Sequence, residues 1–170
     1  MSFKGIKRCR CDGVSLSSFV VRPANKNDVP LICTIEDGSF SDPYPRSLIE
    51  RLQREYSRGF LVVENNSGEL VGYCVASENG AFAHLISIGV LDQYRRRGVG
   101  TILLRALLER LNEQLVDEIW LEVNVGNDGA IKFYERFGFL RVMIIENYYS
   151  DGSHALRMRL PMRRTIGRDG

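Results

Sequence analysis

Apolar residues follow two patterns along the chain, one typical of strands and the other typical of helices. Short apolar runs bounded by Asn, Gly or Pro predict strands, and apolar residues three or four positions apart predict helices. Asn27 or Asp28 is expected to cap the first helix, which ends near Asp37, with a turn at Gly38. The remaining predicted helices span 46–58, 98–114 and 127–137, and the predicted strands span 19–21, 60–64, 70–76, 83–90 and 118–124, with two more closing the domain.

This order of elements predicts a three-layer α/β fold with α+β packing. Its centre is a mixed, mostly antiparallel sheet of about seven strands, and four helices cover the sheet. The length of 170 residues suits a single domain, which we assign to residues 16–162. Residues 1–15 are predicted to be a flexible basic extension, and residues 163–170 a disordered basic tail.

Composition narrows the function classes. The net charge of +2 gives no basic face for specific nucleic-acid binding, and no apolar run is long enough to span a membrane. The N-terminus lacks the apolar centre of a signal peptide, so a cytoplasmic location is expected. The four cysteines lack a second pair at ligand spacing, which predicts no metal site. They are expected to be reduced, although a disulfide stays open as an alternative; the four are Cys9, Cys11, Cys33 and Cys74.

The strongest chemical signal is a basic turn between a strand and a helix. Arg95, Arg96 and Arg97 precede Gly98 and Gly100, and the amphipathic helix follows at once. A helix start offers unpaired N–H groups, glycines allow close approach of the backbone, and arginines add charge-assisted donors. The segment therefore predicts a diphosphate site, and a solvated basic corner is the alternative. Neither the GxxxxGK[ST] nor the GxGxxG phosphate motif is present.

The spacing Arg95-x-x-Gly98-x-Gly100 resembles the pyrophosphate signature of the GNAT acetyltransferase superfamily. Residues 118–139, EIWLEVNVGNDGAIKFYERFGF, resemble the second half of the acetyl-CoA site in its N-terminal acetyltransferases. Residues 147–152, with a tyrosine pair, resemble the hairpin that covers the peptide in the same group. The resemblance runs from about Ser18 to Met162 and is closest to the archaeal Ard/NatA-type catalytic subunits and to RimI.

The resemblance implies the GNAT fold and acetyl-CoA as cofactor. A backbone N–H near Val90 is implied as the oxyanion donor, and a β-bulge at Gly89 would expose it. Asn127 is implied as a cofactor-binding residue, and a role as helix N-cap is compatible with that. The implied cofactor-binding residues are Ile88, Val90, Arg95, Arg96, Arg97, Gly98, Val99, Gly100, Thr101, Asn127 and Tyr134.

Three residues carry the expected catalysis. The resemblance places Glu122 and His84 as a shared general base, His84 acting through water, and Tyr134 as the acid that protonates the CoA thiolate. Each has a simpler alternative: Glu122 as a surface carboxylate, His84 as a structural histidine and Tyr134 as an aromatic core residue. An α-amine with a pKa of ~8 is already partly neutral near neutrality, so a modest base suffices.

The substrate side is expected to have two walls. The resemblance assigns Phe40, Asp42 and Tyr44 to one wall and the pair Tyr148 and Tyr149 to the other, with Asp42 selecting the first side chain of a peptide. Asp42 alternatively belongs to an Asp-Pro turn. Two departures from the family stand out, because Ser153-His154 replaces an acidic pair and Tyr44 replaces a tryptophan that is usual in RimI-like chains.

The sequence therefore predicts an enzyme that transfers acetyl from acetyl-CoA to the N-terminal α-amine of proteins, by direct attack in a ternary complex. Nascent chains or ribosomal proteins are the candidate substrates, and a monomer or weak dimer is expected. Two alternatives remain: a GNAT acting on lysine or a small-molecule amine, and a non-catalytic acyl-CoA-binding regulator. The tyrosine pair argues against the first, and the joint presence of His84, Glu122 and Tyr134 argues against the second.

Overall fold

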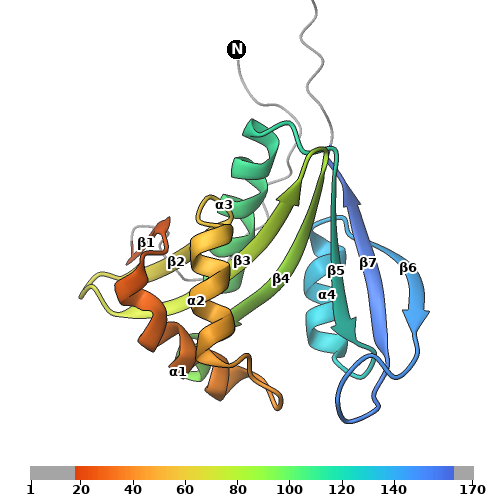
Figure 1. Cartoon of the computed structure of the whole chain (residues 1–170), viewed down its shortest axis with the longest axis horizontal. Coiled ribbons are helices and arrows are strands. Elements are labelled where there is room, and N and C mark those ends of the chain that lie inside the picture. The colour runs from red at the N-terminus through yellow and green to blue at the C-terminus, as the bar shows by residue number, and fades with distance from the viewer. Residues whose placement is uncertain (1–17, 163–170) are drawn as a thin grey trace, which may run out of the picture.

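The computed structural model describes residues 18–162. The predicted extension, with Cys9 and Cys11, and the predicted basic tail lie outside this range. The chain forms one seven-stranded sheet in the order β1-β2-β3-β4-β5-β7-β6 (Figure 1). The strands are β1 Phe19–Pro23, β2 Phe60–Asn65, β3 Leu70–Asn79, β4 Phe82–Val90, β5 Glu118–Asn124, β6 Leu140–Ile145 and β7 Ala155–Pro161.

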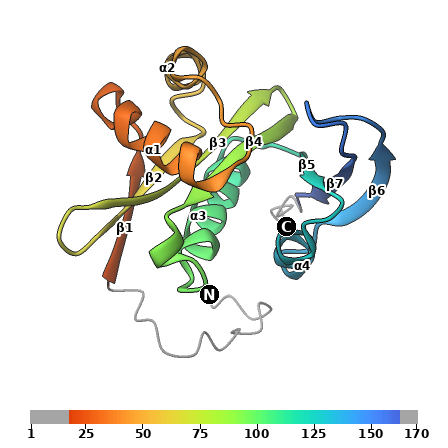
Figure 2. The same ribbon diagram turned by 90° about the horizontal axis from the view of Figure 1, so that it is seen from below.

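Within residues 18–162, four α-helices cover the sheet, as the sequence predicted. They are α1 Val29–Ser39, α2 Arg46–Glu55, α3 Val99–Glu113 and α4 Asp128–Arg136. Figure 2 shows α1 and α2 on one face of the sheet and α3 and α4 on the other. Each face buries its own apolar cluster, with Ile32, Ile49 and Tyr73 under α1 and α2, and Leu103, Leu121 and Ile131 under α3 and α4. No helix in the range 18–162 is long and apolar enough to cross a membrane.

The first two helices differ at their ends from the sequence prediction. A short 3-10 helix, Lys26–Asp28, precedes α1, and Asn25 closes it in a capping box with Asp28. Asp28 is the N-cap residue of α1, as predicted, but its side chain accepts from the Asn25 N–H and makes no cap bond to α1. The side-chain cap is Asn25, at the start of the extra turn. Gly38 is helical, so α1 continues to Ser39, whereas α2 ends at Glu55 and not at Arg58.

The sheet opens between its two central strands. All other neighbours pair antiparallel, but β4 and β5 are parallel, and their pairing is confined to Phe82–His84 and Glu118–Trp120 in the described chain. Beyond these residues the two strands separate, as Figure 1 shows. A ligand can therefore meet the edge of β4 without displacing a strand.

A β-bulge lies in β4, but three residues before the expected position. Val75 pairs with Ser87 and Ala76 with Leu85, which leaves Ile86 as the extra residue. Gly89 is instead in regular register with Tyr73, so the bulge expected there is wrong. A Cβ at Gly89 would lie 2.8 Å from the Tyr73 ring, which explains why this position lacks a side chain.

Candidate active site

The start of α3 is an open set of backbone donors. Gly98 has φ +83°, a left-handed conformation that favours glycine, and it directs the chain from the basic turn into the helix. No side chain in the described range caps this end, and the first turn carries no acidic residue. The first N–H groups of α3 therefore lack helical acceptors and lie at the positive end of its dipole. These features suit the pyrophosphate of a nucleotide cofactor.

The three arginines of the turn differ in their contacts. Arg95 donates from Nε to the Val90 carbonyl at 3.1 Å and pairs with Asp92 at 2.7 Å, so it stabilises the turn itself. Arg96 has φ +61°, an unusual conformation for a side chain of this size. The Arg97 guanidinium lies 5.7 Å from the Tyr94 ring centre. Arg96 and Arg97 are exposed beside the helix start and are the side chains best placed for phosphate.

The end of β4 presents backbone groups to the opening in the sheet. Leu91 donates its N–H to the Val71 carbonyl at 3.0 Å, so Leu91 and, by alternation, Gly89 bond toward β3. The main-chain groups of Ile88 and Val90 therefore point the other way, toward β5, where pairing has ended. An extended amide chain, such as the pantetheine arm of CoA, can pair with them.

Helix α4 supplies the last two expected cofactor residues. The Asn127 side chain accepts from the Ala130 N–H at 3.0 Å, so its oxygen caps α4 and its amide nitrogen is the group able to donate to a ligand. Tyr134 is buried against Phe133 and Phe139 on the α3 and α4 face. Burial raises the pKa of the Tyr134 phenol well above its usual range, so this hydroxyl remains protonated.

Glu122 lies on the face of the sheet that carries α1 and α2, and it contacts two basic side chains there. One carboxylate oxygen lies 2.6 Å from Nε2 of His84, and the other accepts from Nε of Arg157 at 2.7 Å. The Glu122 side chain is 6% exposed and that of His84 is 43% exposed. Burial acts to raise the pKa of Glu122, but the bonds to His84 and Arg157 outweigh it and lower this pKa. Glu122 is therefore a carboxylate with both oxygens engaged.

The tyrosines of both expected substrate walls lie within electrostatic range of this carboxylate. Burial raises the pKa of Tyr44, Tyr148 and Tyr149, and the charge of Glu122 adds to the increase in each case. The Tyr148 and Tyr149 rings meet edge to face at 5.0 Å. His154 joins the two ends of the loop that carries both tyrosines, because its Nδ1 accepts from the Asn147 N–H at 3.0 Å. His154, which stands where the resembling family has an acidic residue, therefore has a structural role.

The two walls also touch. The Ser150 hydroxyl donates to the Asp42 carboxylate at 2.6 Å, joining the segment between α1 and α2 to the loop between β6 and β7. Phe40 is exposed at the start of the first segment. Ser150 was not expected from sequence, and a serine in a loop carries no signal that would reveal this partner.

A cavity of about 380 Å³ lies over the Glu122 face. His84, Glu122 and Tyr148 line it, as the sequence placed them, but several lining residues were missed. These are Ser77, Asn79, Phe82, Ala83, Trp120 and Arg157. Phe82 lies two positions from His84 on β4, and Trp120 lies two positions from Glu122 on β5. Residues two apart on a strand face the same side, so the sequence could have predicted these two.

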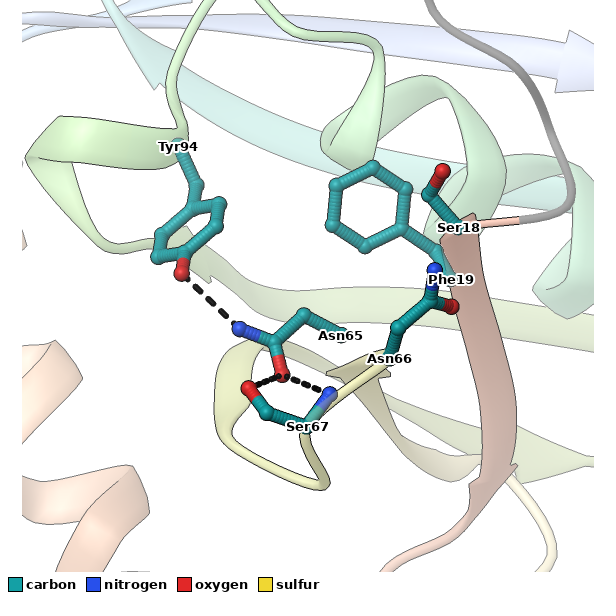
Figure 3. A pocket seen from close by; sticks show the side chains of 6 residues that line it. All are labelled: Ser18, Phe19, Asn65, Asn66, Ser67 and Tyr94. Carbon is teal, nitrogen blue, oxygen red and sulfur yellow. Dashed lines mark hydrogen bonds between the residues drawn. The ribbon is translucent and has the colours of Figure 1, made fainter.

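A second cavity, of about 420 Å³, lies beside the basic turn (Figure 3). The Tyr94 hydroxyl accepts from the Asn65 amide at 2.9 Å and donates to Glu69 at 2.7 Å, while Phe19 packs edge to face against the Tyr94 ring. These bonds join the basic turn to the β2–β3 turn. These contacts, and not the cavity, hold the basic turn against the β2–β3 turn.

Neither described cysteine is placed for chemistry. Cys74 is fully buried, and burial raises the pKa of its thiol to about 12, while burial also raises the pKa of the partly buried Cys33 thiol. Both thiols are free. Within residues 18–162 no cluster of three His, Cys, Asp or Glu could hold a metal ion.

Comparisons with known proteins agree with this geometry. Residues 29–139 match the acetyltransferase (GNAT) family. An N-alpha-acetyltransferase of Sulfurisphaera tokodaii is 35% identical over 155 residues, covering 84% of this chain and 92% of the relative. The ribosomal protein bS18-alanine N-acetyltransferase of Escherichia coli is 32% identical over 138 residues, covering 79% and 92%. The structure of Ard1 from Thermoplasma volcanium superposes with a TM-score of 0.83 at 33% identity, covering 86% of this chain and 99% of that chain.

Proposed function

Because the chain belongs to the acetyltransferase (GNAT) family, we propose that it acetylates the free α-amine of protein N-termini with acetyl-CoA. The observation that carries this proposal is that two tyrosine-bearing walls, joined by the bond between Asp42 and Ser150, lie within electrostatic range of the Glu122 carboxylate. Glu122 contacts His84, and the sheet opens between β4 and β5. Similar proteins are named as enzymes of this activity.

His84 is the general base of this proposal. A carboxylate only accepts hydrogen bonds, so the 2.6 Å contact with Glu122 places the proton of neutral His84 on Nε2. The basic atom is then Nδ1, which takes a proton from the ammonium directly or through one water. Glu122 orients the ring and stabilises the imidazolium that forms. This divides the expected shared base into a proton acceptor, His84, and a carboxylate that supports it.

The reaction needs one bond formed and one broken. His84 first releases the ammonium proton to solvent, and the neutral amine nitrogen then attacks the thioester carbon. As the N–C bond forms and the C–S bond breaks, the second amine proton passes to His84 and on to solvent, from which Tyr134 regains the proton that it gives to the thiolate. Tyr134 lies on the far side of the sheet opening and donates a proton to the departing thiolate. The main-chain N–H groups of β4 are the donors for the carbonyl oxygen. The buried Cys74 thiol supports direct transfer without an acetylated enzyme.

The peptide occupies the space between the two walls. In this proposal the hydroxyls of Tyr148 and Tyr149 bond the extended backbone of the peptide, and the bond between Asp42 and Ser150 closes the walls over it. An extended main chain distinguishes a protein N-terminus from a small-molecule amine, which has no backbone for these hydroxyls. Nascent chains and ribosomal proteins fit this requirement.

The test is an initial-rate assay with acetyl-CoA and peptides that differ in their first residue. We expect turnover on free α-amines and none on N-blocked peptides that contain lysine. Turnover on the blocked peptides would instead assign lysine acetylation. Binding of acetyl-CoA with silence on every peptide would favour a small amine as acceptor or a regulatory role.

A further inference from the structure

Glu36 is a buried carboxyl that the mechanism above does not use. It lies in the last turns of α1 and is 2% exposed, so its two oxygens require partners within the protein. The Tyr73 hydroxyl donates to Oε2, and the Ser87 hydroxyl lies 2.7 Å from the Tyr73 oxygen and 3.4 Å from Oε2. This oxygen therefore joins α1 to β3 and β4. Gly89 provides the space for the Tyr73 ring in this cluster.

The other oxygen reaches the proposed peptide site. Tyr44 donates its backbone N–H to Oε1 of Glu36 at 3.2 Å. Tyr44 lies between Pro43 and Pro45, where the chain cannot form a helix and the N–H lacks a helical acceptor. Its ring is half-buried and electrostatically coupled to Tyr148 across the site. A single carboxylate thus connects the sheet to the wall that faces the tyrosine pair.

We propose that Glu36 is a positioning residue of the peptide site, whose carboxylate fixes the backbone at Tyr44 and so sets the wall facing Tyr148. This inference rests on the N-terminal acetyltransferase function proposed above and adds to it a residue that does not touch the substrate. Asp42 and Ser150 hold the same segment from its exposed side, whereas Glu36 holds it from the core.

The ionisation of Glu36 gives the proposal a distinctive signature. Burial raises the pKa of this carboxyl to about 7, and the charge of Asp37 on the same helix adds to the increase, while bonds from Tyr44 and Ser87 oppose it. Tyr73 from β3 bonds to it directly, and the charge of Glu36 also acts on the Cys33 thiol and the Tyr44 phenol, raising the pKa of each. Above pH 7 the carboxylate makes a charge-assisted bond to Tyr44, and below pH 7 the protonated group makes a weaker one.

A glutamine at this position reproduces the neutral form at every pH. Its oxygen still accepts from the Tyr44 N–H, and its amide donates to the Tyr73 hydroxyl, which then donates to Ser87. Glu36→Gln therefore removes charge and keeps the shape, whereas Glu36→Met removes the acceptor as well. Glu55→Gln, at an exposed carboxyl that ends α2, is the matched control.

The experiment measures KM for a peptide and for acetyl-CoA separately, at pH 8 and pH 6, after a thermal melt has shown that each variant is folded. At pH 8 we expect E36Q to raise the peptide KM about fivefold and E36M about tenfold, with the acetyl-CoA KM unchanged. At pH 6 the ratio of E36Q to wild type falls toward one, and any pH dependence that the two enzymes share cancels in this ratio. E55Q matches wild type at both pH values.

Two results would overturn the proposal. One is a peptide KM for E36Q equal to wild type at pH 8, and the other is an equal rise in both Michaelis constants, which indicates a general structural role. If E36M does not fold, E36Q and its pH dependence decide the question. A wild-type enzyme that binds acetyl-CoA but acetylates no α-amine would contradict the proposed function itself, and that result is distinct from either outcome for Glu36.

Discussion

The two halves of the candidate site are built in different ways. Most of the cofactor half, from Ile88 to Thr101, is one continuous segment that offers main-chain groups at a strand end and at an uncapped helix start, and α4 adds Asn127 and Tyr134. The peptide half joins two loops through side chains, and the Asp42 to Ser150 bond connects residues 108 positions apart. A side-chain substitution can therefore delete a contact in the peptide half, whereas the main-chain donors of the cofactor half can be changed only through the backbone conformation.

The halves meet at Glu122, where the largest effect is expected. Glu122→Gln keeps the shape of the side chain but removes the charge that holds His84 and stabilises its protonated form. We expect kcat to fall by about 10²- to 10³-fold, the scale of general-base catalysis. The acetyl-CoA KM should stay near the wild-type value, because Glu122 lies on the opposite face of the sheet from Tyr134. Steady-state kinetics with both substrates varied measures these values.

Glu118→Gln is the matched control for this substitution. Glu118 lies on the same face of β5 and pairs with Arg159 at 2.8 Å, just as Glu122 pairs with Arg157 at 2.7 Å. It does not contact His84, so its substitution should leave kcat within about twofold of wild type, as is usual for a partly exposed ion pair. Equal losses in the two variants would show that an ion pair between a β5 glutamate and a β7 arginine, and not the contact with His84, limits the rate.

The cofactor half is tested through Gly98. Gly98→Ala places a side chain at φ +83°, which costs about 1–2 kcal/mol, and the turn relieves this strain by rotating the N–H groups at the start of α3. We expect the acetyl-CoA KM to rise about fivefold to thirtyfold, with the peptide KM unchanged. Kinetics with acetyl-CoA varied at saturating peptide measures the change.

Gly68→Ala separates strain from ligand binding. Gly68 has φ +78° in the turn between β2 and β3, and as at Gly98 an added Cβ meets no atom within 4 Å. Both variants should lose similar stability in chemical denaturation, but only G98A should change the acetyl-CoA KM. A normal KM in G98A would mean that the backbone donors of α3 do not bind the cofactor.

This contrast explains how much of the molecule could be predicted from its sequence. The sheet, the four helices and the strand β5 at 118–124 were predicted correctly, because each depends on a local period of apolar residues. The sequence also pointed to the cofactor half, since its glycines and arginines lie within a few positions of one another. The bulge was placed wrongly at Gly89, because the glycine accommodates the Tyr73 ring from a neighbouring strand and does not mark an extra residue.

The peptide half could be predicted only in outline. The tyrosine pair and Asp42 were identified, but Arg157, Ser150 and Glu36 were not. Arg157 alternates with buried residues along β7 and reads as a surface position, until the register places it opposite Glu122. Glu36 reads as one polar residue of an amphipathic helix. The partners of these side chains lie on other elements, and short-range sequence patterns do not contain that information.

The smallest expected effect concerns the contact between the two walls. Asp42 and Ser150 are both exposed, so their bond competes with water and should contribute only about 0.5–1.5 kcal/mol. Asp42→Ala and Ser150→Ala should each raise the peptide KM about twofold to tenfold and leave the acetyl-CoA KM unchanged. The double variant should be no worse than either single variant, because each already removes the same bond.

The same variants separate two roles for Asp42. If Asp42 only holds the walls together, D42A and S150A weaken binding by the same factor for every peptide, whatever its first residue. If Asp42 also selects the first side chain, D42A should improve peptides that begin with Asp or Glu relative to those that begin with Ser or Ala, since a repelling carboxylate has been removed. S150A keeps that carboxylate and should show no such change in preference. Equal preferences in wild type and D42A would therefore limit Asp42 to the wall contact, and place selection of the first residue elsewhere in the peptide half.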